Sequence, residues 1–472
     1  MKAWIPVAGL LAYSGAVFAG PVSAYLPVNL APEMERSVER FLLISDVPVV
    51  KRPIAIRAVE DALEIGCERD AGLCAEVRDI LARYQSRAGV AWAETELSVS
   101  NHDDMTLFNR RGETTDDWWH GSVGGYWRAH DNILFNLGMV ASDSNFTPDG
   151  SFVSVGFDTF QIDVGYKPHW ISPMRGSAML LSTQAETYAT VSFSNVRPID
   201  LWGVGFNYEL FWGQLSHSDR IRYEDGFTSG KPYVAGMQFS LEPFDGVSIG
   251  LSRMMQYGGG ARGGASIKDI FKAFFDPSGT DNRGDDLSMD DEFGNQQVAL
   301  FTRVNFSGSV PFAIYLEYAG EDTAKGSNKR IGNAALSGGI DFPRVWQDFD
   351  LTYEFSQWQD AWYVHSIYLD GMTNEGTVLG HWGATQRVMG DGVGAQAHEL
   401  FVGWQYSSRT RFDLNYKTLQ NESYSRNDYV RAHSLTLKAS LKHGGYLWGG
   451  ELMVGRDVFD EDYARLGGFV RW

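Results

Sequence analysis

Cysteine is scarce in this sequence, and a long apolar run is absent beyond the N-terminal leader. Only two cysteines, Cys67 and Cys74, occur among 472 residues, which excludes a disulfide-rich scaffold. A membrane-spanning helix needs about 20 predominantly apolar residues, and no segment after the leader has them. Positive charge is also in deficit, since 59 acidic residues face 40 basic ones and the net charge is −19. This balance argues against nucleic acid or an anionic membrane surface as a partner.

Catalytic and cofactor-binding motifs are missing as well. We find no Gly-x-Ser-x-Gly elbow, P-loop, zinc-protease helix or dinucleotide fingerprint. The glycine-rich run Gly258–Gly264 lacks the Lys-Ser/Thr pair of a phosphate-binding loop. The acidic stretch Asp276–Glu292 fits no EF-hand spacing, so we interpret it as a solvated or cation-bridged loop in preference to a specific calcium site. We therefore expect no enzyme and no cofactor, and the sequence names no metal ligands.

Glycine and aromatic residues are abundant, and from Trp92 onward they lie in segments of alternating polarity. The chain has 52 Gly, 15 Trp, 21 Tyr and 28 Phe. Within one segment, Phe312, Ile314 and Leu316 share a face, while Tyr315 and Glu317 share the other. A period of two predicts β-strands. Many short alternating strands of this composition are typical of a transmembrane β-barrel.

The lengths of the connections favour a barrel over a soluble sandwich. Short connections, such as 130–131 and 407–408, alternate with long ones, such as 257–295 and 359–396. Outer-membrane barrels have short periplasmic turns, long outer loops and an even number of strands. We therefore predict an all-β transmembrane barrel of about 18 antiparallel strands over residues 91–472, preceded by a small N-terminal α-helical bundle. The strands begin near residues 92, 121, 132, 151, 159, 187, 203, 234, 247, 296, 312, 334, 349, 397, 409, 431, 446 and 463.

The last ten residues, 463–472, have the pattern of the closing strand of such a barrel. Leu466, Val470 and Trp472 lie on one parity, with Arg465 and Phe469 on the other. The final strand must pair with the first to remove the open edges of the sheet. The terminal Trp472 resembles the signal that the barrel-assembly machinery reads. We expect that machinery as a partner, together with outer-membrane lipid and lipopolysaccharide.

The first 90 residues divide into a leader and a helical segment. Residues 1–24 have the features of a signal peptide, with candidate cleavage points after Ala19 and Ala24, of which we favour Ala24. Residues 25–90 have the period of helices, which we expect over 32–44, 56–65 and 71–86. Export and the pattern of connections predict a barrel in the outer membrane, with extracellular loops and a periplasmic helical bundle.

The two cysteines lie at the junction of the second and third expected helices. In an exported protein their default state is a disulfide, which typically contributes about 2–4 kcal/mol. A redox or metal-binding pair would need a Cys-x-x-Cys spacing or nearby histidines, and neither is present. We therefore predict a disulfide between Cys67 and Cys74.

The long loops combine aromatic rings with charged and polar groups. Aromatic rings can stack on the apolar faces of sugars, while carboxylates, amides and guanidinium groups hydrogen-bond the hydroxyls. The alternative for each ring is an interfacial aromatic belt or ordinary loop packing. The candidate glycan-binding residues are Trp118, Trp119, His169, Trp170, Arg175, Glu321, Asp322, Trp362, His381, Trp382 and Arg387.

Several short motifs, in their order along the chain, resemble the Wzi-type capsule assembly proteins. The resemblance covers essentially the whole mature chain. It implies an 18-stranded outer-membrane barrel with a periplasmic helical bundle. It also implies a role in retaining capsular or related exopolysaccharide at the cell surface, by lectin-like binding without catalysis. The motifs are Tyr25-Leu-Pro-Val-Asn-Leu-Ala-Pro32, His169-Trp-Ile-Ser-Pro-Met-Arg175, Phe293-Gly-Asn-Gln296, Tyr318-Ala-Gly-Glu-Asp322, Tyr368-Leu-Asp-Gly371 and Leu379-Gly-His381.

Two other functions are compatible with such a barrel. An 18-stranded barrel is wide enough to hold water unless protein fills it, so the main alternative is a porin or transport channel for small solutes or polysaccharide. The loops 257–295 and 359–396 are long enough to fold inward, and the helices could close the inner mouth, which favours a closed pore. A membrane-embedded hydrolase would need a Ser–His pair at the rim, and no motif points to one.

Overall fold

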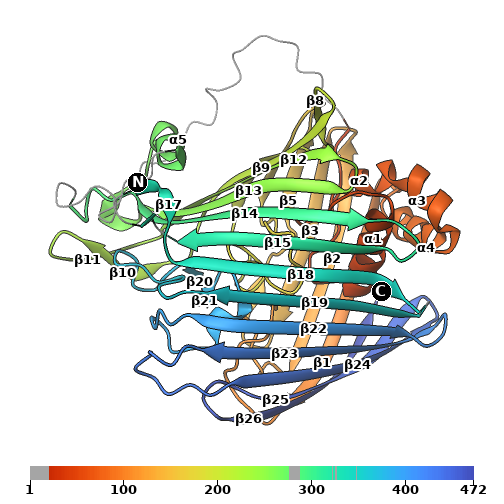
Figure 1. The fold of residues 1–472 in the computed structure, drawn as a ribbon. Helices are drawn as coiled ribbons and strands as arrows, with labels where there is room; N and C mark the ends of the chain where they lie inside the picture. Colours follow the sequence, from red (N-terminus) through yellow and green to blue (C-terminus); the bar gives the residue numbers. More distant parts are fainter. Residues whose placement is uncertain (1–20, 276–287, 322, 325–326, 347) are drawn as a thin grey trace.

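The structure of the protein, a computed structural model, describes residues 21–275, 288–321, 323–324, 327–346 and 348–472. These residues form a closed antiparallel β-barrel of 18 strands with helices at one end (Figure 1). The predicted fold class is confirmed, including the short strands expected near 151 and 159. The barrel strands are β1 (Ala88–Ser100), β2 (Trp119–His130), β3 (Ile133–Ser142), β5 (Phe152–Gly156), β6 (Gln161–Gly165), β7 (Thr190–Ser194), β9 (Val204–Gln214), β12 (Tyr233–Phe244), β13 (Val247–Tyr257), β14 (Gly294–Phe306), β15 (Phe312–Glu321), β18 (Ala334–Val345), β19 (Phe349–Trp358), β22 (Ala395–Gln405), β23 (Thr410–Asn421), β24 (Ala432–His443), β25 (Tyr446–Arg456) and β26 (Asp462–Arg471).

Shorter strands accompany the barrel at its two ends. β4 pairs with β3, and β8 pairs with β9. The other short strands form three separate two-stranded sheets in the long connections. These short strands are β4 (Phe146–Thr147), β8 (Ile199–Leu201), β10 (Ser218–Tyr223), β11 (Gly226–Gly230), β16 (Thr323–Ala324), β17 (Ser327–Ile331), β20 (Thr373–Asn374) and β21 (Thr377–Val378).

The barrel closes between its first and last strands. β1 and β26 pair in antiparallel register, with Glu94 opposite Arg471. The Trp472 N–H also donates to the Ala93 carbonyl at 2.9 Å. Closure removes the sheet edges that would otherwise expose unpaired backbone groups. We call the end of the barrel that carries the helices the helical end. The opposite end, where the long connections lie, is the loop end.

Side chains on the strands alternate between the outer wall and the lumen. On β14, Leu300 and Phe306 are 51% and 42% exposed, whereas Gln297 and Arg303 on the opposite parity are buried. An apolar outer wall is what a barrel embedded in lipid requires. The inward polar face is also buried in the described structure, because segments of the chain fill the lumen.

The described N-terminal region contains four short helices where we expected three. The second expected helix is divided at Ala62, and the third ends at Ala82 rather than at 86. The turn at Ala62 redirects the chain so that Gly66 packs on the first helix, where an added Cβ would lie 2.3 Å from the Phe41 ring. None of the described helices is long and apolar enough to cross a membrane. The four helices are α1 (Pro32–Ile44), α2 (Ile56–Asp61), α3 (Leu63–Arg69) and α4 (Ala71–Ala82).

Helix α1 is held at the helical end by ion pairs with the barrel wall. The buried Arg36 guanidinium lies 2.8 Å from Asp341 of β18 and 3.2 Å from Asp350 of β19. Glu33 accepts a hydrogen bond from Arg471 of β26 at 2.7 Å. Burial by itself would raise the pKa of Glu33, but the cationic groups beside it, Arg471 first, lower that pKa to about 2. Because a buried charge needs a partner, these contacts join α1 to the wall.

Two long connections fill the lumen toward the loop end. The segment 166–189 follows β6, the segment 359–394 follows β19, and the two pack together in one hydrophobic cluster. The Ser182 N–H donates to the Leu379 carbonyl at 2.9 Å, and the Ser182 hydroxyl donates to the Gly380 carbonyl at 2.6 Å. The loop at 359–396 therefore folds inward, as its length allows. Small inward side chains on β14, β15, β18 and β22 leave room for it, namely Ala299, Ala319, Ala335, Ala395 and Ala397.

The other very long loop, 257–295, departs from the expectation that it folds inward. Its helix α5 (Ile267–Phe275) packs outside the wall, where Ile270 and Ala273 are buried against β12 and β13 (Figure 1). Arg253, which points outward from β13, donates to carbonyls in the last turn of α5 at 2.7 and 3.0 Å. A guanidinium on an apolar wall needs acceptors, and α5 supplies them. Most of the acidic stretch in this loop, residues 276–287, lies outside the described residues.

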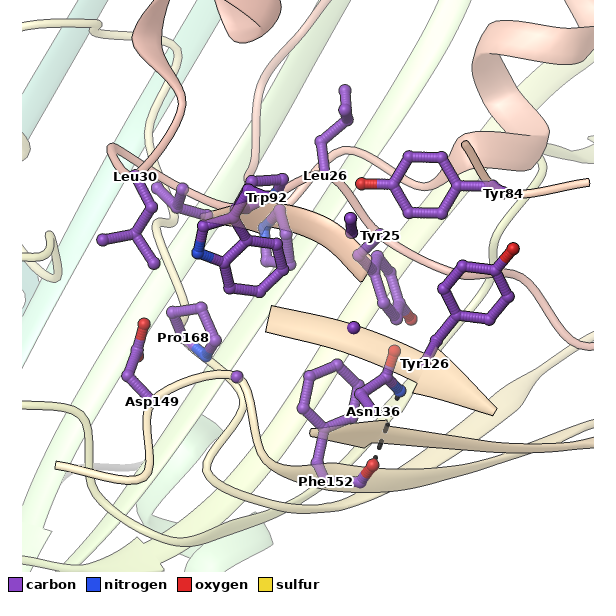
Figure 2. Close-up of a pocket in the computed structure, with 16 residues that line it drawn as sticks. Tyr25, Leu26, Leu30, Tyr84, Trp92, Tyr126, Asn136, Asp149, Phe152 and Pro168 are labelled. Carbon is purple, nitrogen blue, oxygen red and sulfur yellow. Dashed lines mark hydrogen bonds between the residues drawn. The ribbon is translucent and has the colours of Figure 1, made fainter. Parts of the chain in front are cut away.

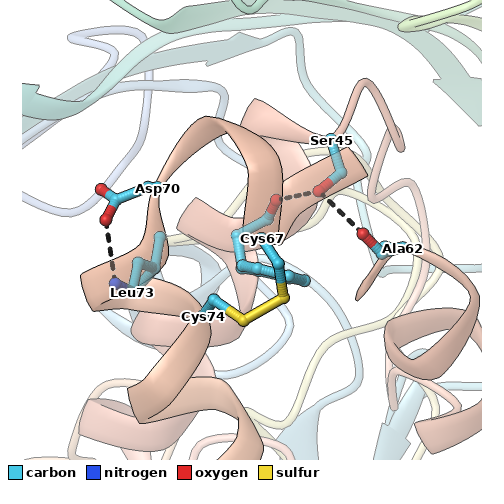
Figure 3. Close-up of a disulfide and its surroundings, with 7 residues drawn as sticks. Ser45, Ala62, Cys67, Asp70, Leu73 and Cys74 are labelled. Carbon is cyan, nitrogen blue, oxygen red and sulfur yellow. Dashed lines mark hydrogen bonds between the residues drawn. A yellow bond between two sulfur atoms is a disulfide. The ribbon is translucent and has the colours of Figure 1, made fainter. Parts of the chain in front are cut away.

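A disulfide joins Cys67 of α3 to Cys74 of α4 (Figure 3). Asp70, between the two helices, accepts a hydrogen bond from the Leu73 N–H at 2.9 Å and so caps the start of α4. Helices this short are marginal in isolation. The disulfide and the cap therefore hold together two elements that depend on their neighbours.

We expect Arg36→Ala to destabilise the assembled barrel by about 3–5 kcal/mol, because Asp341 would keep a buried charge without its guanidinium partner. Asp350 would keep only its pair with Arg411, at 2.8 Å. Heat-modifiable migration of the detergent-folded protein should show a lower unfolding temperature. Arg57→Ala is the control, since Arg57 is partly exposed and lies 3.9 Å from Glu60, a pair worth at most about 1 kcal/mol. Equal unfolding temperatures for the two variants would contradict this account of α1.

We also expect protein isolated from the cell to carry the Cys67–Cys74 bond. Peptide mapping without reduction should recover the linked peptide. Recovery of Cys67 and Cys74 as two freely alkylated thiols would contradict the disulfide.

Candidate functional site

The candidate glycan-binding residues do not gather at one surface. The structure distributes them among the lumenal loop 166–189, the inward-folded loop 359–394 with the neighbouring end of β15, and the rim at the start of β2. Asp322 lies outside the described residues. The local surroundings of each group decide which side chains a ligand at the surface could reach.

His169 is buried in the loop 166–189 and is fully engaged. Its Nδ1 lies 2.8 Å from a Glu209 carboxylate oxygen, and its Nε2 lies 3.0 Å from the Thr190 hydroxyl. The Lys167 ammonium also lies beside Glu209, at 3.3 Å. Burial lowers the pKa of His169. Burial would also lower the pKa of Lys167, but Asp163 and Glu209 keep it well above its usual value. This group neutralises inward-facing charge within the protein.

Trp170 and Arg175 are held between the same loop and α1. Trp170 is 1% exposed, and the Arg52 guanidinium lies 5.7 Å from the centre of its ring. Arg175 donates through its side chain to Glu39 at 2.8 Å and through its N–H to Glu354 at 2.7 Å. Burial would raise the pKa of Glu39, but Arg52 and Arg175 lower it to about 2. These contacts join the loop, the helix and the wall.

Trp362, His381 and Arg387 are engaged within the loop 359–394. The Trp362 indole N–H donates to the Asn333 carbonyl at 2.6 Å, and Arg387 donates to the Trp362 carbonyl at 2.6 Å. His381 Nδ1 accepts a backbone hydrogen bond at 3.0 Å. Burial, and then the nearby Lys417, lowers the pKa of His381 to about 3, so this ring is neutral near pH 7.

Glu321 is brought to the same loop through Tyr363. Its buried carboxylate accepts from the Tyr363 N–H at 2.7 Å and from the Asn295 amide at 2.6 Å. The Tyr363 hydroxyl in turn accepts from the His381 N–H at 2.9 Å. The structure therefore links Glu321 and His381 through the two ends of Tyr363, inside the protein.

Trp118 and Trp119 lie at the rim of the loop end. Trp118 is 55% exposed, and its indole N–H donates to Asp143 at 2.8 Å. Trp119 is partly exposed and shares its strand parity with the outward-facing Val123, while His120 on the other parity is buried. Of the described candidates, Trp118 is the side chain best placed to meet a ligand from solution.

Three pockets in the described structure have volumes of about 30, 20 and 10 Å³. About 10–15 Å³ of volume measured in this way holds one water molecule, so each of these three pockets has room for one to about three waters and none encloses a sugar ring. The first lies between the N-terminal segment and the wall, and Figure 2 shows the rings of Tyr25, Trp92, Tyr126 and Phe152 around it. These three pockets are therefore too small to hold a sugar unit.

The third pocket lies at the loop end near the closing strands, and we call it the seam pocket. Trp382 packs against the Phe108 ring, with their centres 4.9 Å apart. The Lys417 ammonium lies 4.9 Å from the centre of the Trp382 ring. Aromatic, cationic and acidic groups meet here as they do in polar ligand sites. The pocket is lined by Met105, Phe108, Trp382, Gln386, Lys417, Thr418, Leu419, Ala432, His433, Ser434, Arg456, Asp457 and Tyr463.

Sequence reasoning found Trp382 but missed its neighbours. Phe108 comes from the loop after β1, Lys417 from β23 and Tyr463 from β26. A usable signal in the sequence was an aromatic or charged residue that alternation places on the lumenal face of a strand, near the end of the strand that joins a long loop. Lys417 and Tyr463 are two such residues. That signal does not say which loop residue will cover them.

Sequence comparisons connect this chain with capsule production. The family model described as "Capsule assembly protein Wzi" matches residues 79–455. An uncharacterised 55.8 kDa protein in the cps region of Klebsiella pneumoniae is 26% identical over 229 residues, which is 46% of this chain and 39% of that protein. The match therefore spans less than half the length of the Klebsiella protein.

Comparison of structures gives the same architecture. Wzi of Escherichia coli, described as an outer-membrane protein involved in group 1 capsule assembly and a carbohydrate-binding β-barrel, matches with a TM-score of 0.70 and 15% identity. The match covers 96% of this chain and 99% of that one. OccK11 of Pseudomonas aeruginosa matches with a TM-score of 0.48 and 10% identity, over 82% of this chain and 95% of that one. Because the family model extends from α4 to β25, this protein belongs to the Wzi family of capsule assembly proteins.

Proposed function

We propose that this protein binds capsular or related exopolysaccharide and retains it at the cell surface, as a lectin and not as an enzyme. Membership of the Wzi family is the observation that carries the proposal. The description of Escherichia coli Wzi as a carbohydrate-binding barrel supports polysaccharide as the ligand.

The proposal includes a location in the outer membrane, with the loop end outside the cell and the helical end in the periplasm. Short turns at the helical end and long connections at the loop end support this orientation. Trp472 ends the chain at the helical end, where we propose that the barrel-assembly machinery reads it. The apolar outer wall would contact outer-membrane lipid and lipopolysaccharide.

The domain limits are part of the same proposal: a cleaved leader, a periplasmic helical segment that extends to about residue 90, and a barrel from 91 to 472. The two candidate cleavage points differ in what the mature chain keeps. Ser23 and Gln161 exchange two hydrogen bonds, at 2.9 and 3.1 Å. Cleavage after Ala19 would preserve them, whereas cleavage after Ala24 would remove them, so the contacts favour Ala19.

Packing of the lumen supports retention over transport. The loops 166–189 and 359–394 form a hydrophobic cluster with inward side chains of the wall, and α1 is anchored at the helical end. A transport channel needs a continuous aqueous path, and a packed core of this kind excludes water. We therefore propose a closed barrel that acts through its rim.

The proposed glycan surface is the rim around Trp118 and around the mouth of the seam pocket, which is too small for a sugar ring to enter. Trp118 and Arg456 are exposed there, so the first can stack on a sugar face and the second can hydrogen-bond hydroxyls or acidic groups. Trp382 and Lys417 would form the floor of the pocket. We propose that Trp119 lies at the edge of this surface. The remaining described candidates would support the loops from within, namely His169, Trp170, Arg175, Glu321, Trp362, His381 and Arg387.

We expect the intact protein to show no steady conductance in planar bilayers. Deleting residues 361–392 should open a pore, because that segment fills the lumen. Deleting residues 267–275, which form α5 outside the wall, should leave the barrel closed and is the matched control. Large porin-like channels from the intact protein would favour the transport function instead.

We expect cells that lack the protein to make and export their polysaccharide but shed it into the medium. Trp118→Ala and Arg456→Ala should each weaken retention in part, because one stacking or hydrogen-bonding contact contributes about 1 kcal/mol. The double variant should release most of the polymer. One polymer binds many barrels on a cell, so a small loss of affinity at each barrel becomes a large loss of overall affinity. The measurement is the ratio of the polysaccharide released into the medium to the polysaccharide that remains on the cells.

Trp202→Ala is the control for that experiment, because Trp202 is 99% exposed but lies in a turn at the helical end. It should leave retention unchanged. Heat-modifiable migration would confirm that each variant assembles. A well-assembled double variant that holds polymer as firmly as the parent would rule out this rim as the glycan surface.

A further inference from the structure

One histidine and two carboxylates converge at the loop end, beside the junction of the first and last strands. His102 lies in the loop that follows β1, while Asp457 and Glu461 lie in the turn between β25 and β26. His102 Nε2 lies 3.0 Å from a Glu461 carboxylate oxygen and 3.6 Å from an Asp457 carboxylate oxygen. One ligand atom from each residue lies within 4.8 Å of the other two.

The His102 imidazole is buried without the hydrogen bonds that it needs. Both ring nitrogens are inaccessible, and neither makes a hydrogen bond of acceptable geometry within the described residues. The side chains of His102 and Asp457 are 12% and 5% exposed, whereas that of Glu461 is 67% exposed. Buried polar nitrogens are normally satisfied. An unsatisfied ring aimed at two carboxylates, with one open side, has the form of a site for a cation.

Hydrogen bonds from backbone N–H groups position parts of this cluster. Asp457 accepts hydrogen bonds from the N–H groups of Phe459 and Glu461 at 2.8 and 2.9 Å, which fixes its carboxylate. The His102 N–H donates to the Ser100 hydroxyl at 3.1 Å. Arg456, the cation next in sequence, is paired instead with Asp460 and Asp462. These contacts fix the Asp457 carboxylate and the backbone at His102, whereas the Glu461 side chain lies at the exposed side of the cluster.

We propose that His102, Asp457 and Glu461 bind a divalent transition-metal ion of the zinc class, with water completing the coordination. Ligand atoms about 2.0–2.2 Å from a tetrahedral Zn²⁺ lie about 3.3–3.6 Å apart, close to the two separations measured from His102. Calcium and magnesium prefer oxygen ligands only, whereas imidazole together with carboxylate favours zinc and its neighbours. The ion would take the lone pair of Nε2 and both carboxylate charges.

The bound ion would link the loop after β1 to the turn between β25 and β26, where the barrel closes. His102 is joined to β26 through the preceding residue, Asn101. The Asn101 N–H donates to the Ala464 carbonyl at 3.2 Å, and the Asn101 side-chain oxygen accepts from the Ala464 N–H at 2.6 Å. Asp457 also lines the seam pocket. Metal binding would therefore stiffen the rim there, and this inference stands independently of glycan binding.

Titration calorimetry with ZnCl₂ tests the inference on full-length, detergent-folded protein that has been treated with EDTA and dialysed. We expect one zinc ion per chain, with CaCl₂ binding at least about tenfold more weakly. Glu461→Gln removes one ligand at an exposed position and should lower zinc affinity at least about tenfold without affecting assembly. His102→Ala should do the same, and zinc should raise the unfolding temperature of the parent but not of either variant.

His443→Ala is the matched control, since this exposed histidine lies at the helical end of β24. It should leave zinc affinity unchanged. The proposal fails if the parent binds no zinc, or if binding survives Glu461→Gln and His102→Ala. It also fails if His443→Ala weakens binding as much as they do, because the ion would then be adventitious.

Discussion

Neutralising the charges that face into the barrel is the constraint on which the rest of this structure depends. An ionised carboxylate in a filled lumen is very costly without a partner. Asp341 receives the guanidinium of Arg36 from α1, and Glu354 receives the N–H groups of Arg175 and Gly176 from a lumenal loop. Glu209 of β9 pairs in the same way with the Lys167 ammonium from a lumenal loop, so the strands carry charged and polar groups whose partners lie in the inserted segments. The barrel wall and the segments inside it therefore stabilise each other, because each supplies hydrogen-bond and ion-pair partners that the other lacks.

A filled lumen leaves the rim as the place where the barrel can meet a polymer. Most of the aromatic and charged loop residues are used in packing the interior, as Trp362 and His381 show. Of the described candidates, Trp118 is the most accessible, and under the proposed function it would bind a sugar weakly. A long polysaccharide presents many repeats to many barrels, so weak individual sites are sufficient for retention. Under the proposed function, a chain rich in aromatic residues would therefore still present only a modest binding surface.

The two longest loops fold in opposite directions for a local reason. Alanines on the inward face of β14, β15, β18 and β22 leave space that the loop 359–394 fills. On the outside of β12 and β13, Met237 and Arg253 instead provide an apolar surface and an unsatisfied donor, which α5 covers. Loop length permitted either outcome, and the side chains of the neighbouring wall selected between them.

The sequence by itself determined the barrel, its strand number and its closing strand, because a period of two and the lengths of connections are local properties of the chain. It also determined the family, through motifs that keep their order, and located Trp382 among the candidates. Only the tertiary structure decided that Trp362 is buried while Trp118 is exposed, and that Asp457 meets His102 across the seam. The physical reason is that closure and filling bring together residues far apart in the sequence. Which of them share a space depends on volumes and charges that no single segment carries.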